Sequence, residues 1–355
     1  MIRFAEAGDI DAIQCFLRKY WRSDHIFVRS REILEWQHVG SGGTNLNFVL
    51  GLHGDTGEVM GLLGFIPLSR FDGGLGDSLD FWLAIWRVRD DVQEVAGLGL
   101  VLLQFLRSRK NPRSIGAVGL SKMVVPIYKA LGYKVGKLRQ FFVLNPEMRE
   151  FAIAEPGKAV DASSFSASAT KFYRYAEPGR AGFSAIAGDL DALLEAQASI
   201  PRKSAAYFRA RYLEHPIYRY RLILAYRQDR LIGLTILRKV EVGRAKALRM
   251  VDLCSGASDL SFLASLLPRL MKEEDAEFVD FYCHGFDSDA VRSAGLLDVD
   301  DFPGTVIPNY FEPFEKRRVD LDFAYWTRLG ESRSYRFVKG DSDQDRPNVV
   351  SGVPL

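Results

Sequence analysis

The sequence predicts an α/β protein made of two domains in tandem. The chain has 355 residues, of which 47% are hydrophobic and 26% charged, which is enough for two separate cores. Apolar runs of strand length alternate with stretches whose apolar residues recur at helical spacing. A similar order of elements follows again after residues 146–180, a segment rich in Ala, Ser, Gly and Pro.

The elements of the first half follow from its hydrophobic spacing. A strand at 2–4 leads to Gly8-Asp9, an N-cap signal, and then to a helix in which Ile10, Ile13 and Leu17 recur on one face. The other expected elements are a helix at 30–36, hairpin strands at 47–52 and 59–66, a strand at 79–88, a helix after Gly97, a strand at 115–120, a helix at 124–131 and a last strand pair around 140–144. The predicted order is βααβββαβαββ.

The second half is predicted to repeat this order. The expected elements are helices at 190–197 and 205–212, strands at 220–226, 231–239 and 247–253, a helix at 260–272, a strand at 278–283 and a helix at 290–295. A coincidental α/β order is the alternative, because the repetition lies in the elements and not in sequence identity. We expect a first domain at 1–146, a linker at 147–180, a second domain at 181–335 and a polar C-terminal tail at 336–355.

Charge and composition argue against several classes of protein. The net charge is +2, with 47 basic and 45 acidic side chains, which favours neither nucleic acid nor an anionic membrane as a partner. No apolar run reaches the roughly 18 residues of a membrane span, and the N-terminus lacks a signal-peptide pattern, so we expect a cytoplasmic protein. Cys15, Cys254 and Cys283 have no paired spacing, which predicts buried thiols and no metal site. The expected assembly is a monomer or a homodimer.

A glycine loop follows the apolar strand at 79–88. It reads Glu94-Val95-Ala96-Gly97-Leu98-Gly99 and opens an apolar helix. Because the first N–H groups of a helix have no acceptor within the helix, they can hold a phosphate. A tight turn with glycines for close packing is the alternative. The second half has Asp259 near the corresponding place, where its carboxylate would repel a phosphate.

The element order, the glycine loop and the segment Tyr128-Lys129-Ala130-Leu131-Gly132-Tyr133 resemble the GNAT superfamily of acyl-CoA-dependent N-acyltransferases. Its phosphate loop is R/Q-x-x-G-x-G/A, with Glu94 here in the first position, and its later signature is Tyr-x-x-x-Gly-Phe/Tyr. The resemblance implies two tandem domains, each a mixed, mostly antiparallel twisted sheet flanked by helices. With the two halves, residues 21–26 and 339–348 resemble double-domain nucleotide-sugar N-acyltransferases, especially those that transfer 3-hydroxybutanoyl groups.

The resemblance implies that coenzyme A binds the first domain. The implied contacts are Trp86, Val88, Val95, Ala96, Gly97, Leu98, Gly99 and Ser121. The phenol of Tyr128 is a plausible donor of a proton to the departing thiolate, and a buried structural tyrosine is the alternative. Backbone N–H groups after a bend near residues 83–86 are expected to polarise the thioester carbonyl.

Two residues are candidates for the base that deprotonates the acceptor amine. His25 lies in the loop between the first two helices, where the resemblance implies that the acceptor approaches. A histidine that braces the loop is the alternative. Asp80 is the second candidate for the base and also a candidate substrate contact. A carboxylate within a strand is, however, more often part of a salt bridge.

The tail carries polar groups suited to a nucleotide sugar. Arg346 could pair with a diphosphate, and Asp343, Asp345 and Asn348 could hold sugar or base hydroxyls, as the resemblance suggests. A frayed terminus is the alternative that composition supports.

We therefore expect an enzyme that moves an acetyl or 3-hydroxybutanoyl group from acyl-CoA to the amine of a nucleotide-linked deoxyamino sugar, in particular a dTDP-sugar, by direct attack. The resemblance places this reaction in the biosynthesis of surface polysaccharide such as O-antigen. One alternative keeps the fold and acylates an amino acid, a peptide or an aminoacyl-tRNA. Another is a protein that binds acyl-CoA or a sugar nucleotide without catalysis.

Overall fold

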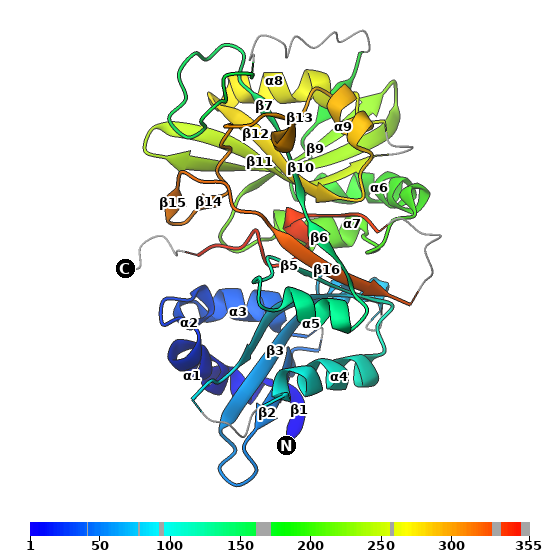
Figure 1. Cartoon of the computed structure of the whole chain (residues 1–355). Coiled ribbons are helices and arrows are strands. Elements are labelled where there is room, and N and C mark those ends of the chain that lie inside the picture. The colour runs from blue at the N-terminus through cyan, green and yellow to red at the C-terminus, as the bar shows by residue number, and fades with distance from the viewer. Residues whose placement is uncertain are drawn as a thin grey trace. The chain divides into compact units, whose positions relative to one another are not determined.

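The computed structural model describes residues 1–40, 42–76, 79–91, 96–160, 172–255, 259–328 and 335–348. The chain forms two compact units, each made of separate stretches of sequence (Figure 1). Unit 1 comprises Met1–Val135, Phe323–Gly330 and Arg346–Leu355, and unit 2 comprises Gly136–Asp322 and Glu331–Asp345. Within the described ranges, no helix combines the length and the apolar character needed to cross a membrane.

Unit 1 begins with a strand and three helices, which are β1 (Ile2–Glu6), α1 (Ile10–Tyr20), α2 (Ile26–Arg29) and α3 (Arg31–His38). As the spacing predicts, α1 buries Ile10, Ile13 and Leu17. Cys15 lies off this apolar stripe and is exposed, so the prediction that all three thiols are buried is wrong for this residue.

The sheet of unit 1 has seven strands in the order β1-β2-β3-β4-β5-β16-β6. The further strands are β2 (Asn45–Leu52), β3 (Val59–Pro67), β4 (Asp80–Val88), β5 (Ser114–Val118), β6 (Lys134–Lys137) and β16 (Asp322–Thr327). Strands β1 to β4 pair antiparallel, β4 and β5 are parallel, and β16 is antiparallel to β5.

Two helices of unit 1 pack on this sheet after β4. In α4 (Leu98–Lys110), Leu102, Leu103 and Leu106 are buried and belong to the same core as Phe81 of β4. The short helix α5 (Val125–Ala130) adds Tyr128 to that core. The apolar face of α4 therefore fixes the position of its first turn beside the sheet.

The sheet of unit 2 repeats the layout of the first. Its strands are β7 (Arg139–Leu144), β8 (Arg174–Ala176), β9 (Tyr220–Arg227), β10 (Arg230–Val242), β11 (Ala245–Ser255), β12 (Phe278–His284), β13 (Leu297–Asp298) and β17 (Phe337–Val338). The order is β13-β7-β12-β11-β10-β9-β8, with β17 also paired to β12. Strands β11 and β12 are parallel, and the other pairs described for this sheet are antiparallel.

The helices of unit 2 also follow the predicted order. They are α6 (Phe183–Gln197), α7 (Ala205–Phe208) with a π-helical turn at Arg209–Leu213, α8 (Leu263–Glu274) and α9 (Ser288–Ser293). A separate small hairpin joins β14 (Tyr310–Phe311) and β15 (Phe314–Glu315). Both units thus have a mixed, mostly antiparallel sheet with helices, which confirms the predicted fold class.

Two strands join sheets that sequence order alone does not indicate. Strand β7, which falls inside the predicted first domain at 1–146, pairs with β12 and β13 in the sheet of unit 2. Strand β16, from the predicted second domain, pairs with β5 in unit 1. Phe141 and Phe142, neighbours on opposite faces of β7, are both buried, so this strand needs a sheet that is covered on both sides.

Part of the predicted linker at 147–180 is packed on unit 2. The N–H groups of Ala152, Ile153 and Ala154 donate hydrogen bonds of 2.7–3.1 Å to the carboxylate of Glu277. Ile153 is fully buried in the core of unit 2. Strand β8 also lies within the predicted linker, and residues 161–171 are outside the described ranges.

Candidate functional site

The sheet of unit 1 splits where β4 leaves β5. The two strands pair in parallel from Asp80 and Ser114 to Leu83 and Ala117, but β4 continues to Val88. On its other side, β4 shifts register against β3, because Leu63 pairs with Trp86 whereas Phe65 pairs with Leu83. The extra residue on β4 forms a β-bulge, in which backbone groups leave the regular ladder. This bulge lies where the sequence predicts a bend.

Helix α4 begins at the same end of the sheet. Its N-cap is Gly97, with φ 78° and ψ −7°, a left-handed conformation that favours glycine. A Cβ at this position would meet no atom of the described residues within 4 Å, so in this part of the chain the space beside the first turn is open. Ala96 is exposed, and Val95 lies outside the described residues. The N–H groups of this first turn lack intrahelical acceptors and are suited to an anion.

The next two residues of the glycine loop are used for packing. A Cβ on Gly51 would lie 2.9 Å from Leu98, so the Leu98 side chain packs closely on β2. A Cβ on Gly99 would lie 2.9 Å from the indole Nε1 of Trp86. Packing of this kind uses the Leu98 side chain and the Cα side of Gly99, so the backbone N–H groups of both residues stay available to a ligand. Val88 lies at the end of β4, half-buried.

Tyr128 lies beside the strand split. Its ring centroid is 5.6 Å from that of Trp86 and 5.0 Å from that of Tyr133, and the residue is 2% exposed. Burial raises the pKa of the Tyr128 phenol, so it keeps its proton at neutral pH. Ser121 is exposed shortly before α5. The structure thus places the predicted acid next to a predicted coenzyme contact on β4.

His25 is the N-cap of α2. Its Nδ1 accepts a hydrogen bond of 3.2 Å from the N–H of Phe27, so the proton of the neutral ring is on Nε2. The residue is 5% exposed, and Nε2 has no hydrogen-bond partner in the described part of the chain. Burial, and next the charge of Arg346, lower the pKa of His25 to about 3. These contacts leave no free lone pair on the ring, and they favour a structural role over the predicted base.

Arg346 and Asn348 belong to unit 1, although the sequence places them in a tail. The guanidinium carbon of Arg346 is 5.5 Å from the ring centroid of Phe27, and its Nη1 is 3.5 Å from Oδ1 of Asn348. The imidazole of His25 also contacts Phe27, with 5.0 Å between the ring centroids. The structure therefore brings two predicted site residues, His25 and Arg346, to one phenylalanine, and places Asn348 beside Arg346.

Asp80 has a different setting. It is 2% exposed at the first position of β4, at the end of the strand away from the split. Its Oδ1 accepts hydrogen bonds from Nε of Arg113 at 3.1 Å and from the Ser114 hydroxyl at 2.6 Å. Asp80 therefore forms the structural ion pair that was the alternative to a base or a substrate contact.

Asp343 and Asp345 lie inside unit 2. Asp345 is 3% exposed and accepts hydrogen bonds from Arg238 at 2.7 Å and from the Tyr220 hydroxyl at 2.8 Å. Burial alone would raise the pKa of Asp345, but Arg238 holds it well below its ordinary value. Asp343 is buried and accepts a hydrogen bond from Gln344 at 3.1 Å. Their contacts are those of structural carboxylates, and they do not support the predicted contact with a sugar.

In unit 2 the corresponding strand split is filled. Strands β11 and β12 pair in parallel over Leu248–Met250 and then part, with a register shift in β11 as in β4. Beyond that point β17 pairs with Cys283 and His284 of β12. A Cβ on Gly340 would lie 2.5 Å from the carbonyl oxygen of Val251. Residues 337–341, which we call the C-terminal segment, therefore occupy the opening between these strands.

Charged groups that the sequence analysis missed hold the C-terminal segment. The ammonium of Lys203 lies 2.6 Å from a carboxylate oxygen of Asp341 and 2.8 Å from one of Asp252. Arg211 donates to the carbonyl oxygens of Gly340 at 3.1 Å and Ser342 at 2.7 Å. The alternation of Asp341, Asp343 and Asp345 is the sequence signal that could have indicated buried partners.

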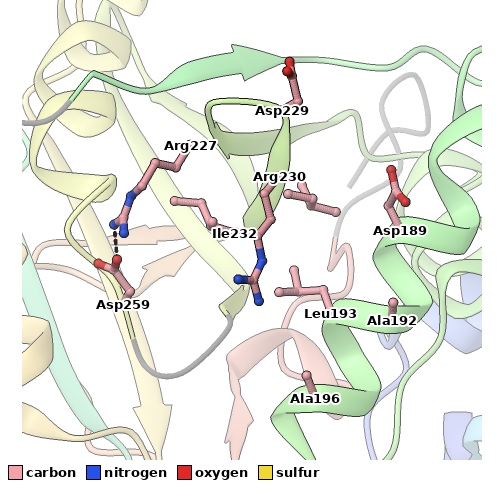
Figure 2. A pocket seen from close by; sticks show the side chains of 10 residues that line it. Asp189, Ala192, Leu193, Ala196, Arg227, Asp229, Arg230, Ile232 and Asp259 are labelled. Atoms are coloured by element: carbon pink, nitrogen blue, oxygen red, sulfur yellow. Dashed lines mark hydrogen bonds and ion pairs between the residues drawn. The ribbon is translucent and has the colours of Figure 1, made fainter.

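Unit 2 also has a cavity of about 510 Å³ between α6 and the turn that joins β9 to β10 (Figure 2). Arg227 forms an ion pair with Asp259 at its edge, and Arg230 extends into it. Asp189 and Asp229 line it as well. The cavity is therefore lined by three carboxylates and two guanidiniums, one of which is already paired with Asp259, and this excess of carboxylates disfavours a polyphosphate.

No protein-family model matches the sequence, and no curated protein matches it. Solved structures do match. A GCN5-related N-acetyltransferase from Anabaena variabilis has a TM-score of 0.55 and 11% identity, over 92% of this chain and 72% of its own. Another GCN5-related N-acetyltransferase, from Kribbella flavida, has a TM-score of 0.52 and 14% identity, over 92% of this chain and 70% of its own.

A third match is a GCN5-related glucosamine N-acetyltransferase region of a fungal multi-domain β-N-acetylglucosaminidase. It has a TM-score of 0.50 and 12% identity, over 92% of this chain and 38% of its own. At these identities the likeness concerns the fold. The chain consists of two tandem α/β units with the fold of GCN5-related N-acetyltransferases.

Proposed function

We propose that unit 1 binds acyl-CoA and transfers its acyl group to an amine. The observation that carries this proposal is the strand split after Leu83, which opens at the same end of the sheet as the first turn of α4. The split supplies room between two strands, and the helix start supplies N–H groups for a diphosphate. The fold of N-acetyltransferases, reached independently of these details, supports the same reaction.

The residues present fit coenzyme A. Gly97, Leu98 and Gly99 would hold its diphosphate through their N–H groups, because no Cβ fills the space at Gly97. Trp86, Val88 and Ser121 remain proposed contacts of its pantetheine arm, as does Val95 outside the described residues. The bound acyl-CoA supplies an activated thioester.

Two groups of unit 1 would serve the chemistry. The N–H groups freed at the bulge of β4 would donate hydrogen bonds to the thioester carbonyl. The phenol of Tyr128, which keeps its proton at neutral pH, would give it to the leaving sulfur. We assign no general base, because the free nitrogen of His25 carries the proton and Asp80 is paired with Arg113.

We further propose a nucleotide-linked deoxyamino sugar, in particular a dTDP-sugar, as the acceptor, with acetyl or 3-hydroxybutanoyl as the acyl group. Arg346 offers a guanidinium for the diphosphate, and Asn348 and the Nε2–H of His25 offer neutral groups for hydroxyls. The resemblance to the double-domain sugar acyltransferases supports this acceptor. So does the fungal glucosamine N-acetyltransferase region, at the level of a shared fold. Assembly of surface polysaccharide such as O-antigen is the pathway we propose.

Release of free thiol tests the function. We expect turnover when acetyl-CoA or 3-hydroxybutanoyl-CoA is mixed with dTDP-amino sugars. The variant Arg346→Gln should raise KM for the sugar several-fold and leave the affinity for CoA unchanged, whereas Arg109→Gln, an exposed change on α4, should alter neither. Deletion of the tail is a poorer test, because it removes the buried Asp341 and Asp345.

Other results would redirect the proposal. Turnover with amino acids, peptides or aminoacyl-tRNA, and none with sugars, would change the acceptor. Thermal stabilisation by acyl-CoA without turnover on any amine would indicate a binding protein. Neither binding nor turnover of acyl-CoA would overturn the proposal.

A further inference from the structure

A small cavity of about 90 Å³ lies in unit 1, where β2 begins and β3 ends. Asn47 of β2 and Phe65 of β3 contribute to its walls, together with Arg70 and with Lys110, the last residue of α4. Gly97 precedes the other end of this 13-residue helix. At 1.5 Å per residue the two ends are about 20 Å apart, so the cavity is separate from the proposed acyl-CoA site.

The lining of this cavity is positively charged. Arg70 and Lys110 contribute two cations, and none of the described residues that line it is acidic. In the described part of the chain, Arg70 forms no ion pair. Its Nη2 is 3.5 Å from the carbonyl oxygen of Glu35, at the limit of a hydrogen bond, and its guanidinium lies 5.8 Å from the ring centroid of Phe71. The ammonium of Lys110 lies 5.2 Å from the ring centroid of Phe4.

Two donors of the cavity are buried without acceptors. The Nε atom of Arg70 and the Nδ2 atom of Asn47 have no hydrogen-bond partner in the described ranges. Asn47 is 8% exposed, so its amide cannot rely on bulk water. Burial lowers the pKa of Arg70, as expected for a cation without a counter-ion. Buried donor atoms of this kind are costly unless an acceptor or an anion satisfies them.

The volume limits the ligand. At about 30 Å³ per water molecule, 90 Å³ corresponds to roughly three waters, or to one phosphate or carboxylate group. Whole small molecules usually occupy cavities of about 300 Å³ or more. The ligand is therefore a small oxyanion, or one oxyanionic group of a larger molecule.

We propose that this cavity binds an oxyanion of the size of a phosphate or carboxylate group, held by Arg70 and Lys110 with a hydrogen bond from Asn47. A guanidinium and an amide offer several N–H groups to the oxygens of such an anion, and an ammonium adds charge. The anion would satisfy the two buried donors and neutralise the cations. No function assigned above uses this site.

Thermal unfolding of the full chain with inorganic phosphate tests the proposal. Phosphate should raise Tm saturably, by about 3 °C at ten times its Kd, beyond a chloride control of equal ionic strength. Arg70→Gln should abolish this rise. Gly97→Asp should retain the phosphate-induced rise in Tm, because the change lies at the other end of α4. Arg109→Gln removes a charge next to Lys110 and should also retain this rise.

A second variant replaces the bound anion with a carboxylate of the protein itself. Asn47→Asp keeps the shape of the side chain and places a carboxylate in the cavity with Arg70. We expect its Tm without phosphate to exceed that of the wild type, and its response to phosphate to be lost. If Arg70→Gln and Asn47→Asp both respond to phosphate like the wild type, or if the wild type responds to neither phosphate nor acetate, the proposal is overturned.

The source of the anion follows from two further measurements. A larger shift with acetate than with phosphate identifies a carboxylate. Competition of phosphate with the acceptor, seen as a raised sugar KM that Arg70→Gln abolishes, identifies a phosphate group of the substrate. A thermal shift without such competition identifies a free anion. The kinetic arm rests on the proposed function, whereas the thermal arms remain decisive if that function fails.

Discussion

The indole Nε1 of Trp86 donates a hydrogen bond of 3.2 Å to the carbonyl oxygen of Gly99. This contact ties β4 to the first turn of α4, and it explains the second glycine of the loop. A Cβ at Gly99 would lie 2.9 Å from Nε1, whereas a Cβ at Gly97 would meet no atom within 4 Å among the described residues. The structural reason for glycine therefore differs between the two positions. Gly99 permits close packing, and Gly97 permits a left-handed N-cap beside open space.

Gly97→Asp should weaken CoA binding far more than Gly97→Asn. Asn and Asp have similar shape and both tolerate a left-handed conformation, so the pair isolates the negative charge beside the helix start. Titration calorimetry should also give one CoA per wild-type chain, because the C-terminal segment fills the split of unit 2. Equal affinities for the two variants would remove the diphosphate from this loop.

Tyr128→Phe should lower kcat about a hundredfold, the scale of general acid catalysis, and leave CoA affinity unchanged. The aromatic ring stays in the core beside Trp86 when only the hydroxyl is removed, so the fold should persist. Tyr133→Phe, its neighbour at 5.0 Å, is the matched control and should keep most of the activity. Equal rates for both variants in a stopped assay would reduce Tyr128 to a packing residue.

His25 should make the stability of the protein depend on pH. Its pKa is about 3 in the folded chain and 6.5 as a free group, so between these values the unfolded chain binds more protons. The contribution to stability is complete above pH 6.5 and is lost as the pH falls toward 3. His25→Asn retains an N-cap acceptor that does not titrate.

From pH 6.5 to about 4.5, the wild type should therefore lose about 2 kcal/mol more unfolding free energy than His25→Asn. Urea denaturation at several pH values measures this difference. The buried His38 and His215, whose pKa values are also lowered to about 3, are present in both proteins and cancel. Parallel pH curves for the two proteins would show that His25 is not buried as a neutral ring.

Lys203→Met should destabilise unit 2 by about 3–5 kcal/mol, because it leaves the buried carboxylates of Asp252 and Asp341 without a cation. Adding Asp341→Asn should restore part of the loss, since burial already raises the pKa of Asp341 to about 6. Lys272→Met, at an exposed pair with Glu147, should cost less than about 1 kcal/mol. Additive losses in the double variant, measured in urea, would show that Lys203 and Asp341 are not coupled.

Local features were predictable from the sequence. The apolar run before Val88 predicts β4, and the spacing of Ile10, Ile13 and Leu17 predicts the buried face of α1. Both predictions succeed because the backbone geometry of a strand or a helix fixes the spacing of side chains on one face within a few residues. Gly97 as the start of a helix follows from local chemistry in the same way. The repetition of element order was likewise visible, and the structure confirms two tandem α/β units.

Only the tertiary structure decided where distant segments pair. Strand β7 lies in the second sheet and β16 in the first, because pairing depends on which strand edges remain open. The proton of the His25 ring is on Nε2 because the N–H of Phe27 donates a hydrogen bond to Nδ1. Asp345 has a structural role because it accepts a hydrogen bond from Arg238, which is 107 residues away in the sequence. The cations beside Asn47 form a cavity only after β2, β3 and the end of α4 meet. Sequence periodicity carries information about neighbours along the chain, whereas ion pairs, burial and cavities arise from neighbours in space.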